Sequence, residues 1–410
     1  MRLSKNIAWF AWVTASVFYA YQYILRVMPN IMLNDIVQQF HINTVVFGQF
    51  AGVYYIGYAA MHLPIGIMLD RIGPRKVMSG CILLTVVGLL PIIFATHWIY
   101  PMIGRALIGI GSSAAILGTF KIIRITFSAQ RFTRMLSLSV TIGLIGAIYG
   151  GGPVSYMCNV LGYKTVVIIF ATLGLVLAAV TYLIVPEIEP NKSKTVWTDI
   201  KTVLKNHRVI FTCLAAGLMV GPLEGFADVW GSSFLNQVYG LSDKTASYLP
   251  SMIFIGMCFG APFLSLIAER TGRYLGVIIG AGTIMFITFL ALILQLLNVD
   301  TIGIGFLLVG VCSAYQILAI YKASTYVPDH VAGLTTAVAN MLIMSFGYAF
   351  HSSIGVVIHA YGGIQSKQAF IYGVGVIPLT LAVGTLIFML VAYQDRKKKT
   401  NFFLCRQNSV

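Results

Sequence analysis

Six charged side chains of this sequence lie inside long apolar runs, where a charge is costly. They are four bases and two acids: Arg26, Arg105, Lys121, Lys322, Glu224 and Asp228. A charge at membrane depth costs at least about 2.5–3.5 kcal/mol, so each group needs an oppositely charged partner or a water-filled cavity. Charges of this kind mark the paths of solutes and protons. We therefore expect these residues to bind a charged solute or to carry protons.

Arg26, Glu224 and Asp228 together suggest a site for a solute that carries both charges. The planar guanidinium of Arg26 can bind a carboxylate or phosphate through two parallel hydrogen bonds. Glu224 and Asp228 are four residues apart, which places them on one helix face about 6 Å from each other. One arginine opposite an acid pair suits a zwitterion, whose carboxylate would bind Arg26 and whose ammonium would bind Glu224.

Other roles for these three residues stay open. Glu224 and Asp228 could equally carry protons, because burial and a like-charged neighbour favour the protonated carboxyl. They could also form an internal ion pair with Arg26 that has no part in binding. Arg26 itself could lie at the outer rim, since it is 19 residues beyond Ile7, roughly 28 Å along a helix.

The three remaining bases have two interpretations each. Lys121 and Lys322 are 201 residues apart, at matching places in the two halves of the chain. We expect both to face a central cavity and bind the solute; the alternative is that each extends towards a membrane surface. Arg105 precedes small residues at Gly109 and Gly111, which let another helix approach closely. We expect Arg105 near an external gate with a role in proton coupling, unless it extends to the outer surface.

The composition predicts a membrane protein that places these charges on transmembrane helices. The 410-residue chain is only 10% charged and 58% hydrophobic, whereas soluble domains carry about 25% charged residues. Its mean hydropathy is +0.86. A bilayer core requires about 20 apolar residues per helix. Twelve stretches meet this requirement, at residues 7–29, 45–69, 77–96, 100–123, 135–158, 165–186, 209–235, 244–267, 274–297, 301–327, 333–359 and 369–393.

We expect these spans to form two six-helix halves of an all-α membrane protein. The polar stretch 187–208 is the expected cytoplasmic linker between residues 1–186 and 209–395, and residues 396–410 are an expected basic cytoplasmic tail. Of the 27 Lys and Arg residues, 20 fall on one side of the spans and 3 on the other. Bases remain on the cytosolic side, so both termini are expected there. The basic excess then follows the anionic lipid surface and does not indicate a nucleic-acid partner.

A turn punctuated by glycine occurs twice, each time between two spans. The first copy covers residues 66–76 and the second residues 265–273, and 199 residues separate Asp70 from Glu269. A repeat of half the chain indicates a duplicated domain, with the site where the two halves meet. The turn residues that we expect to take part in gating are Gly66, Asp70, Arg71, Gly73, Arg75, Glu269, Arg270 and Gly272.

These turns resemble the cytoplasmic loop motif of the major facilitator superfamily, G-x-x-x-D-R-x-G-x-R-[RK], which residues 66–76 match at every defined position. Residues 105–111 are similar to the fourth-helix motif of that family, R-x-x-x-G-x-G. The resemblance implies twelve transmembrane helices in two pseudo-symmetric bundles and secondary transport by alternating access. It implies no enzyme activity, cofactor or metal. It also implies a monomer in a lipid bilayer, in the inner membrane of a bacterium, with a small molecule and protons as partners.

The first span resembles one branch of that family more closely. It is rich in aromatic residues and carries Arg26 before Pro29, like the organophosphate:anion antiporters, in which such an arginine binds substrate. That branch has a second arginine six residues before a tryptophan of the seventh helix. Here Glu224 precedes Trp230 by six residues, so the charge is reversed. The chain is also similar to bacterial amino-acid carriers and to the lysosomal dipeptide carrier group.

Three functions remain in consideration. The first is a proton-coupled carrier of a small zwitterion such as an amino acid or a short peptide. The second is a carrier of organic anions or sugar phosphates, with Arg26, Lys121 and Lys322 around the anion. The third is a receptor or enzyme that uses the same scaffold, but the sequence has no P-loop, no nucleophile constellation and no metal-binding cysteine spacing.

The distribution of bases leads to a prediction about topology. Reporter fusions at Lys5, near Ser193 and at Thr400 should all report a cytosolic location, because bases flank each of these positions. A paired reporter that is active only in the cytosol or only outside measures this directly. One fusion reporting from the outer side would contradict the arrangement in two six-helix halves.

Overall fold

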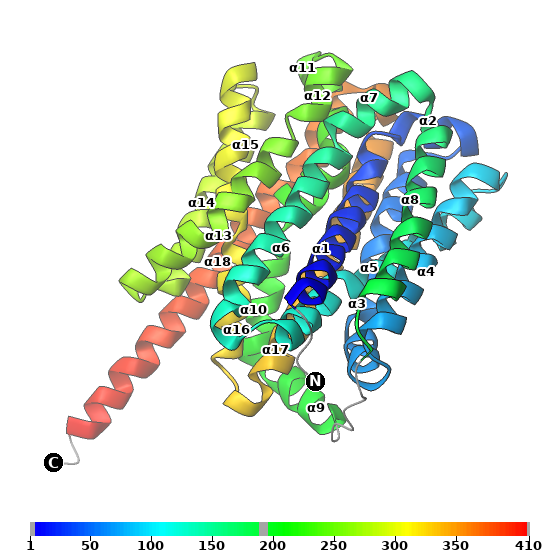
Figure 1. The fold of residues 1–410 in the computed structure, drawn as a ribbon. Coiled ribbons are helices and arrows are strands. Elements are labelled where there is room, and N and C mark those ends of the chain that lie inside the picture. The colour runs from blue at the N-terminus through cyan, green and yellow to red at the C-terminus, as the bar shows by residue number, and fades with distance from the viewer. Residues whose placement is uncertain (1–4, 188–195, 408–410) are drawn as a thin grey trace.

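The computed structural model describes residues 5–187 and 196–407, and this part of the chain is helical with short connections. Eleven of its helices are long and apolar enough to cross a membrane. A further helix, α1 (Lys5–Val27), runs through the bundle beside them (Figure 1). Tyrosines and tryptophans lower the hydropathy of α1, and most of its side chains are buried among other helices. The predicted all-α fold with twelve membrane helices is confirmed.

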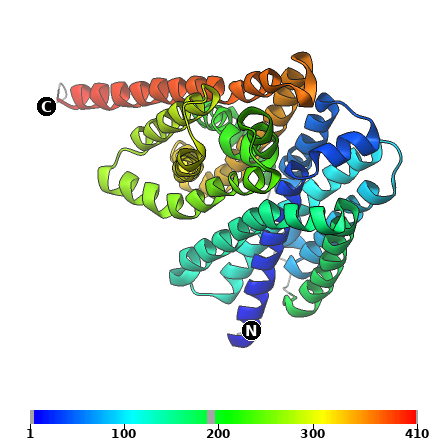
Figure 2. The same cartoon turned by 90° about the horizontal axis from the view of Figure 1, so that it is seen from above.

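The helices form two groups, which separate clearly when the bundle is viewed along its length (Figure 2). The first half consists of α1, α3 (Thr44–Arg71), α4 (Pro74–Phe94), α5 (Ile99–Thr126), α6 (Ala129–Gly150) with α7 (Gly152–Leu161), and α8 (Tyr163–Ile184). The second half consists of α10 (His207–Leu218) with η2 (Gly221–Trp230) and α11 (Gly231–Tyr239), α12 (Asp243–Tyr248) with α13 (Ser251–Thr271), α14 (Tyr274–Ile293), α15 (Val299–Ser313) with α16 (Tyr315–Ser324), α17 (Asp329–Ala360), and α18 (Lys367–Gln407).

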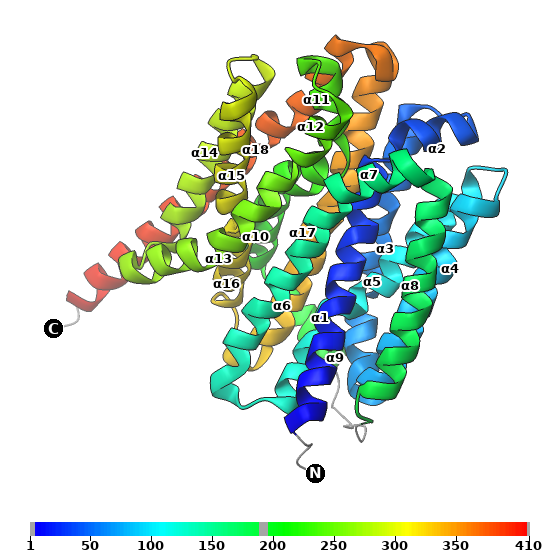
Figure 3. The ribbon, with the colours of Figure 1, turned by 45° about the horizontal axis from the view of Figure 1, so that its top comes forward.

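Both termini point to one end of the bundle. The short η1 (Met28–Asn30) and α2 (Leu33–Phe40) lie at the opposite end, together with α7, α11 and α12 (Figures 1 and 3). We call this opposite end the outer end, because the distribution of bases predicts that the termini are cytosolic.

The predicted spans coincide with these helices to within a turn or two, except at the end of the chain. The helix α18 continues without a break beyond the predicted end of the last span at 393, as far as Gln407, and the cytoplasmic tail at 396–410 stays a prediction. Residues 408–410 lie outside the described part. Within the predicted linker, α9 (Val196–Lys205) is a short helix, and residues 188–195 are not described.

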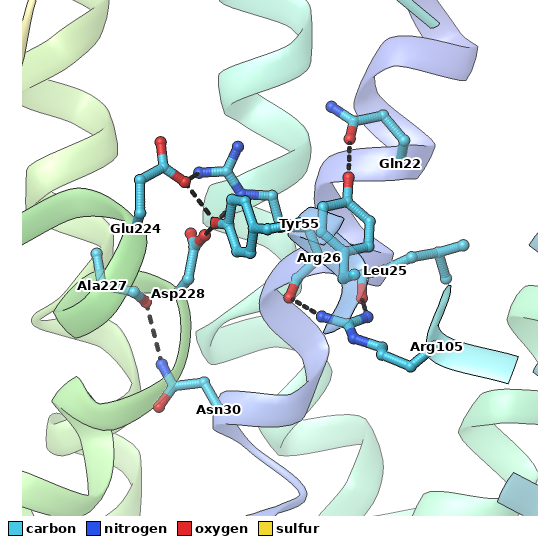
Figure 4. Close-up of polar contacts among 10 residues, drawn as sticks. Gln22, Leu25, Arg26, Asn30, Tyr55, Arg105, Glu224, Ala227 and Asp228 are labelled. Atoms are coloured by element: carbon cyan, nitrogen blue, oxygen red, sulfur yellow. Dashed lines mark hydrogen bonds and ion pairs between the residues drawn. The ribbon is translucent and has the colours of Figure 1, made fainter. Parts of the chain in front are cut away.

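The seventh membrane-spanning segment, α10 with η2 and α11, changes from an α-helix to a π-helix where Glu224 and Asp228 lie. The α-helix α10 ends at Leu218. The segment then continues as the π-helix η2, which has Pro222 in its first turn. Proline has no N–H to donate, so the regular helix ladder is interrupted there. π-Helical turns are rare and are frequent at functional sites. Glu224 and Asp228 both lie in η2 and point towards α1 (Figure 4).

The two halves touch along α3 and α17, α6 and α13, and η1 and η2. Near the outer end of α3, Gly48 packs so closely on α17 that an added Cβ would overlap the carbonyl oxygen of His351. Gly355 of α17 is equally close to the carbonyl oxygen of Thr44. Thr44 Oγ1 also donates to the Gly355 oxygen at 3.0 Å. Backbone therefore lies directly on backbone where the halves close at the outer end.

Small residues also allow close packing inside the first half, as the sequence predicts. An added Cβ at Gly109 would overlap the carbonyl oxygen of Tyr54, and one at Gly111 would overlap that of Cys81. These contacts join α5 to α3 and to α4. The helix that carries Arg105 is therefore held tightly by both neighbours.

The substitution Gly109→Ala should destabilise the protein. Its methyl group would push α5 away from α3, and overpacking of this kind costs about 1–3 kcal/mol. Gly80→Ala is the matched control, because a Cβ there meets no atom within 4 Å, and alanine favours a helix over glycine. Thermal unfolding in detergent should show a lower midpoint for Gly109→Ala alone. Equal midpoints for the two variants would contradict the packing argument.

Candidate functional site

Arg26 of the first half and two carboxylates of the second half form a buried ionic cluster (Figure 4). Arg26 Nε donates to Asp228 Oδ2 at 2.6 Å, and Arg26 Nη2 donates to Glu224 Oε2. Arg26, Asp228 and Glu224 are 5%, 0% and 1% exposed. Arg26 therefore does not lie at the outer rim. The ion pair between Arg26 and the acids, which the sequence left open, is present.

Tyr55 of α3 completes this ionic cluster. Its hydroxyl lies within hydrogen-bonding distance of both Glu224 Oε2 and Asp228 Oδ2. A hydroxyl has one hydrogen to donate, so Tyr55 can donate to only one of the two carboxylates at a time. Asp228 Oδ1 is also buried and lacks a hydrogen-bond partner. The carboxylates of the ionic cluster thus keep unused acceptor capacity.

Arg105 binds the end of α1 instead of a carboxylate. Its Nη1 donates to the Leu25 carbonyl oxygen and its Nη2 to that of Arg26 at 2.7 Å, while the guanidinium lies 4.9 Å from the centre of the Tyr54 ring. The last carbonyls of a helix have no partner within it and carry negative partial charge. Arg105 satisfies them and so fixes the backbone of Arg26. At 2% exposure it does not reach the outer surface.

Asn30 ties the residues after α1 to the second half. Its Nδ2 donates to the Ala227 carbonyl oxygen at 3.2 Å, and its Oδ1 accepts from the Ser232 backbone N–H at 3.3 Å. Asn30 is 3% exposed. The second half is therefore bound to α1 by the ionic cluster and to η1 by an uncharged amide.

Aromatic rings surround the guanidinium of Arg26. Its central carbon lies 4.9 Å from the Tyr23 ring centre and 5.3 Å from the Tyr55 ring centre. Ring faces attract cations, most strongly where water is excluded. His351 of α17 also packs against Tyr55, with 5.5 Å between ring centres. It is fully buried, and neither ring nitrogen has a hydrogen-bond partner.

The two matched lysines are not part of this ionic cluster. Lys121 Nζ binds Asp70 Oδ1 at 2.6 Å, and Lys322 Nζ binds Asp395 Oδ2 at 3.0 Å, both with partly exposed side chains. Lys121 lies 16 residues beyond Arg105, about 24 Å along α5. Each lysine thus pairs with an acid of its own half, towards the end that carries the termini. The expectation that both face the same central cavity as Arg26 does not hold in this conformation.

The first glycine turn has the conformation that its sequence predicts. Gly73 has φ 95° and precedes Pro74, which begins α4. Arg75 Nε donates to the Tyr182 carbonyl oxygen at 2.6 Å, and Lys76 pairs with Glu187 at 2.8 Å. The hydrogen bond from Lys76, and its charge, hold the pKa of Glu187 below its usual value.

The contacts that the structure gives for the turn residues lie within their own halves. Gly66 faces α5, Asp70 pairs as described, and Arg71 is exposed at the end of α3. In the second copy Glu269 and Arg270 are exposed, and Gly272 ends α13 with φ 65°. The ion pairs of the first turn therefore stay within its own half, and a role of both turns in gating stays a prediction.

Sequence reasoning missed the uncharged members of the site. Tyr55 and Asn30 carry no charge, and tyrosine is common in apolar spans, so only their proximity to Arg26 reveals them. Among the described residues, no group of three or more His, Cys, Asp and Glu is placed to hold a metal ion.

Comparison with solved structures shows the same fold. A bacterial homologue of the human lysosomal transporter Spinster, in an inward-facing and occupied conformation, has a TM-score of 0.75 at 16% identity, over 95% of this chain and 98% of that one. Its unoccupied inward-facing form gives 0.73 at 15% identity, over 94% and 98%. A variant of the nucleoside transporter NupG gives 0.76 at 15% identity, over 92% and 100%.

Comparison of the sequence identifies the family. No curated protein sequence matches. The family model described as Major Facilitator Superfamily matches residues 12–352, which is most of the chain and includes both glycine turns and the ionic cluster. The fold of two six-helix halves and the multi-pass membrane character agree with that match. The chain therefore belongs to the major facilitator superfamily, a family of membrane transporters and not of enzymes.

Proposed function

We propose that this protein is a proton-coupled secondary transporter of a small zwitterionic solute, such as an amino acid or a short peptide. The observation that supports this proposal is the buried ion pair of Arg26 with Glu224 and Asp228 across the two halves. Solute sites in this kind of transporter lie where the repeats meet. A zwitterion has the two charges that this site already holds together.

The cost of separating buried charges favours a zwitterion over a solute with one charge. Removing one partner of a buried ion pair costs about 3–5 kcal/mol, because the other charge is left unpaired. A zwitterion replaces both partners: its carboxylate takes the place of the acids on Arg26, and its ammonium takes the place of Arg26 on Glu224. The halves can then separate without leaving either charge alone. Tyr23 and Tyr55 would add ring faces for the ammonium.

An organic anion or a sugar phosphate fits the site less well. It would displace the acids from Arg26 and leave Glu224 and Asp228 unpaired. The other members of the expected anion site, Lys121 and Lys322, are already paired with Asp70 and Asp395. The fold shared with a nucleoside transporter, at 15% identity, does not favour a nucleoside here.

Proton coupling rests on the hydrogen count around Tyr55. One hydroxyl hydrogen cannot serve two carboxylates, so a proton on Glu224 or Asp228 completes the network. Neutralising one acid removes one of the two charges that hold Arg26. Proton uptake and separation of the halves are thereby linked. In this mechanism Arg105 acts indirectly, because it sets the backbone of Arg26.

Gating would use contacts at both ends of the bundle. Towards the outer end, four residues of the first half bind the second half: Arg26, Asn30, Thr44 and Tyr55. At the other end, the glycine turns and the two lysines pair within their own halves, so each half can move as one body. We propose that the turns bind across the halves in the opposite state, in which the outer end is open. In this proposal the protein lies in the inner membrane of a bacterium, with both termini on the cytosolic side. It acts as a monomer.

The charges of the solute can be tested one at a time. Arg26→Ala and Glu224→Gln should each abolish uptake of amino acids or dipeptides into proteoliposomes, and Arg26→Lys should retain part of it. Blocking the amine of the solute should weaken binding to the unaltered protein but change little more in Glu224→Gln, which a double-mutant cycle measures. Asp300→Asn is the control, because this exposed acid lies in the first turn of α15 and is not part of the ionic cluster. Uptake of sugar phosphates without recognition of amines would contradict the zwitterion proposal.

The proton site predicts a loss of coupling without a loss of exchange. A pH gradient of one unit is worth about 1.4 kcal/mol per proton, or about tenfold accumulation of solute. Asp228→Asn should abolish this accumulation while solute exchange between the two sides continues, because exchange needs no net proton movement. Tyr55→Phe should weaken the accumulation in the same direction. If Asp228→Asn still accumulates solute in response to the gradient, the proton binds elsewhere.

A further inference from the structure

The side-chain amide of Asn30 joins two backbone groups of the second half that are five residues apart. Its Nδ2 donates to the Ala227 carbonyl oxygen at 3.2 Å (Figure 4), and its Oδ1 accepts from the Ser232 N–H at 3.3 Å. Asn30 belongs to η1 and is buried. A residue of the first half therefore binds both ends of one stretch of the second half.

This spacing is that of a π-helical hydrogen bond. In a π-helix, each N–H donates to the carbonyl oxygen five residues before it. At the end of η2, the Gly231 N–H donates to the Phe226 carbonyl oxygen in this way. The next bond of that series would join Ser232 to Ala227, and these are the two groups that the Asn30 amide binds. Asn30 thus bridges one position in the hydrogen-bond ladder of the other half.

The bridged stretch contains Asp228. This residue follows Ala227 directly, so the peptide group whose carbonyl oxygen Asn30 binds is the one that leads into Asp228. Asp228 Oδ2 accepts from Arg26 Nε at 2.6 Å. A side chain inserted into a helix ladder bends the backbone at that point. Through the backbone, Asn30 therefore fixes the position from which Asp228 reaches Arg26.

We propose that Asn30 is the positioning residue of Asp228, and that it acts only while the outer end is closed. When the halves part, η1 withdraws the amide from η2. Ser232 then donates to Ala227 directly, the ladder closes, and Asp228 leaves its position opposite Arg26. The proposal rests on the proposed alternation between two states, but not on the charge of the solute.

The exchange leaves each polar group with a partner. The Ala227 carbonyl and the Ser232 N–H bind each other, and the Asn30 amide is hydrated by water that enters from the outer side. Leaving any of these groups buried and unpaired would be costly. The contact can therefore be released and formed again, and the separation of the halves is linked to the release of Asp228.

One peptide group can report this exchange. Ala227–Asp228 is the only alanine followed by aspartate in the sequence. Cell-free synthesis with carbonyl-¹³C alanine and ¹⁵N aspartate therefore gives a single ¹⁵N–¹³C cross-peak in solid-state NMR of proteoliposomes. Asn30→Leu, which is similar in size but cannot form either hydrogen bond, should shift this cross-peak. Gly48→Trp should shift it in the same direction, because a side chain at Gly48 overlaps His351 and keeps the outer end open.

Gly80→Trp is the matched control, since a Cβ at Gly80 meets no atom within 4 Å. Its cross-peak should remain where that of the unaltered protein lies. Gly355→Leu obstructs the same outer contact from α17, through the Thr44 carbonyl oxygen, and serves if Gly48→Trp does not fold. An unchanged cross-peak in the variant that keeps the outer end open, or a shift opposite to that of Asn30→Leu, would overturn the proposal.

A double-mutant cycle tests the link from Asn30 to Asp228. Asn30→Leu should lower the midpoint of thermal unfolding in detergent, and most of this loss should disappear when Asp228→Asn is already present. Thr44→Val removes a different hydrogen bond between the halves, so its loss should be the same in both backgrounds. An equal loss for Asn30→Leu in both backgrounds would make Asn30 a simple tether and refute its positioning role. Failure of amino-acid uptake, with these results intact, would count against the proposed function instead.

Discussion

A charge inside an apolar bundle must have a partner, and this requirement determines how the two halves meet. Within the part of the chain that the structure describes, the ion pairs of Arg26 are with Glu224 and Asp228 of the other half, and neither acid pairs with a base of its own half. Each half is therefore electrostatically incomplete, and the closed outer end completes both. Arg105 holds the end of α1, the π-helix of η2 directs both acids to one side, and Tyr55 fills the space between them.

The same requirement explains why the closed state can be opened. A buried ion pair contributes little net stability, because the loss of hydration offsets much of the attraction. A ligand that supplies the same two charges can therefore take over the contacts at small cost. Where Gly48 and Gly355 meet, α3 and α17 have no side chains that interlock, so the contact that must break there is the hydrogen bond from Thr44 to Gly355. Most of the specificity in closing thus comes from a few polar atoms.

Much of the fold could be predicted from hydropathy and from turn chemistry, but only part of the site. Spans are recognisable because a membrane helix must be apolar over its whole length, and Gly73 with Pro74 allows few conformations other than a turn. Arg26 and the acid pair were identifiable because charges are rare in such spans. Lys121 and Lys322 were misplaced because Asp70 and Asp395 follow the apolar cores of their spans and become partners only in three dimensions. The basic run after Asp395 obscured the continuation of α18, since helix formation there does not depend on hydropathy.

His351 raises the free energy of the state in which the outer end is closed. Its imidazole is sealed between α3 and α17 with both nitrogens unpaired, and leaving a buried polar group unpaired costs about 1–3 kcal/mol. Water would reach the ring as the two helices part, and that penalty would disappear. Exposure of His351 to water would therefore offset part of the cost of separating α3 from α17, by about 1–3 kcal/mol. A penalty of this size in the closed state reduces the difference in free energy between the states with the outer end closed and open. The transporter can then pass from one state to the other more readily.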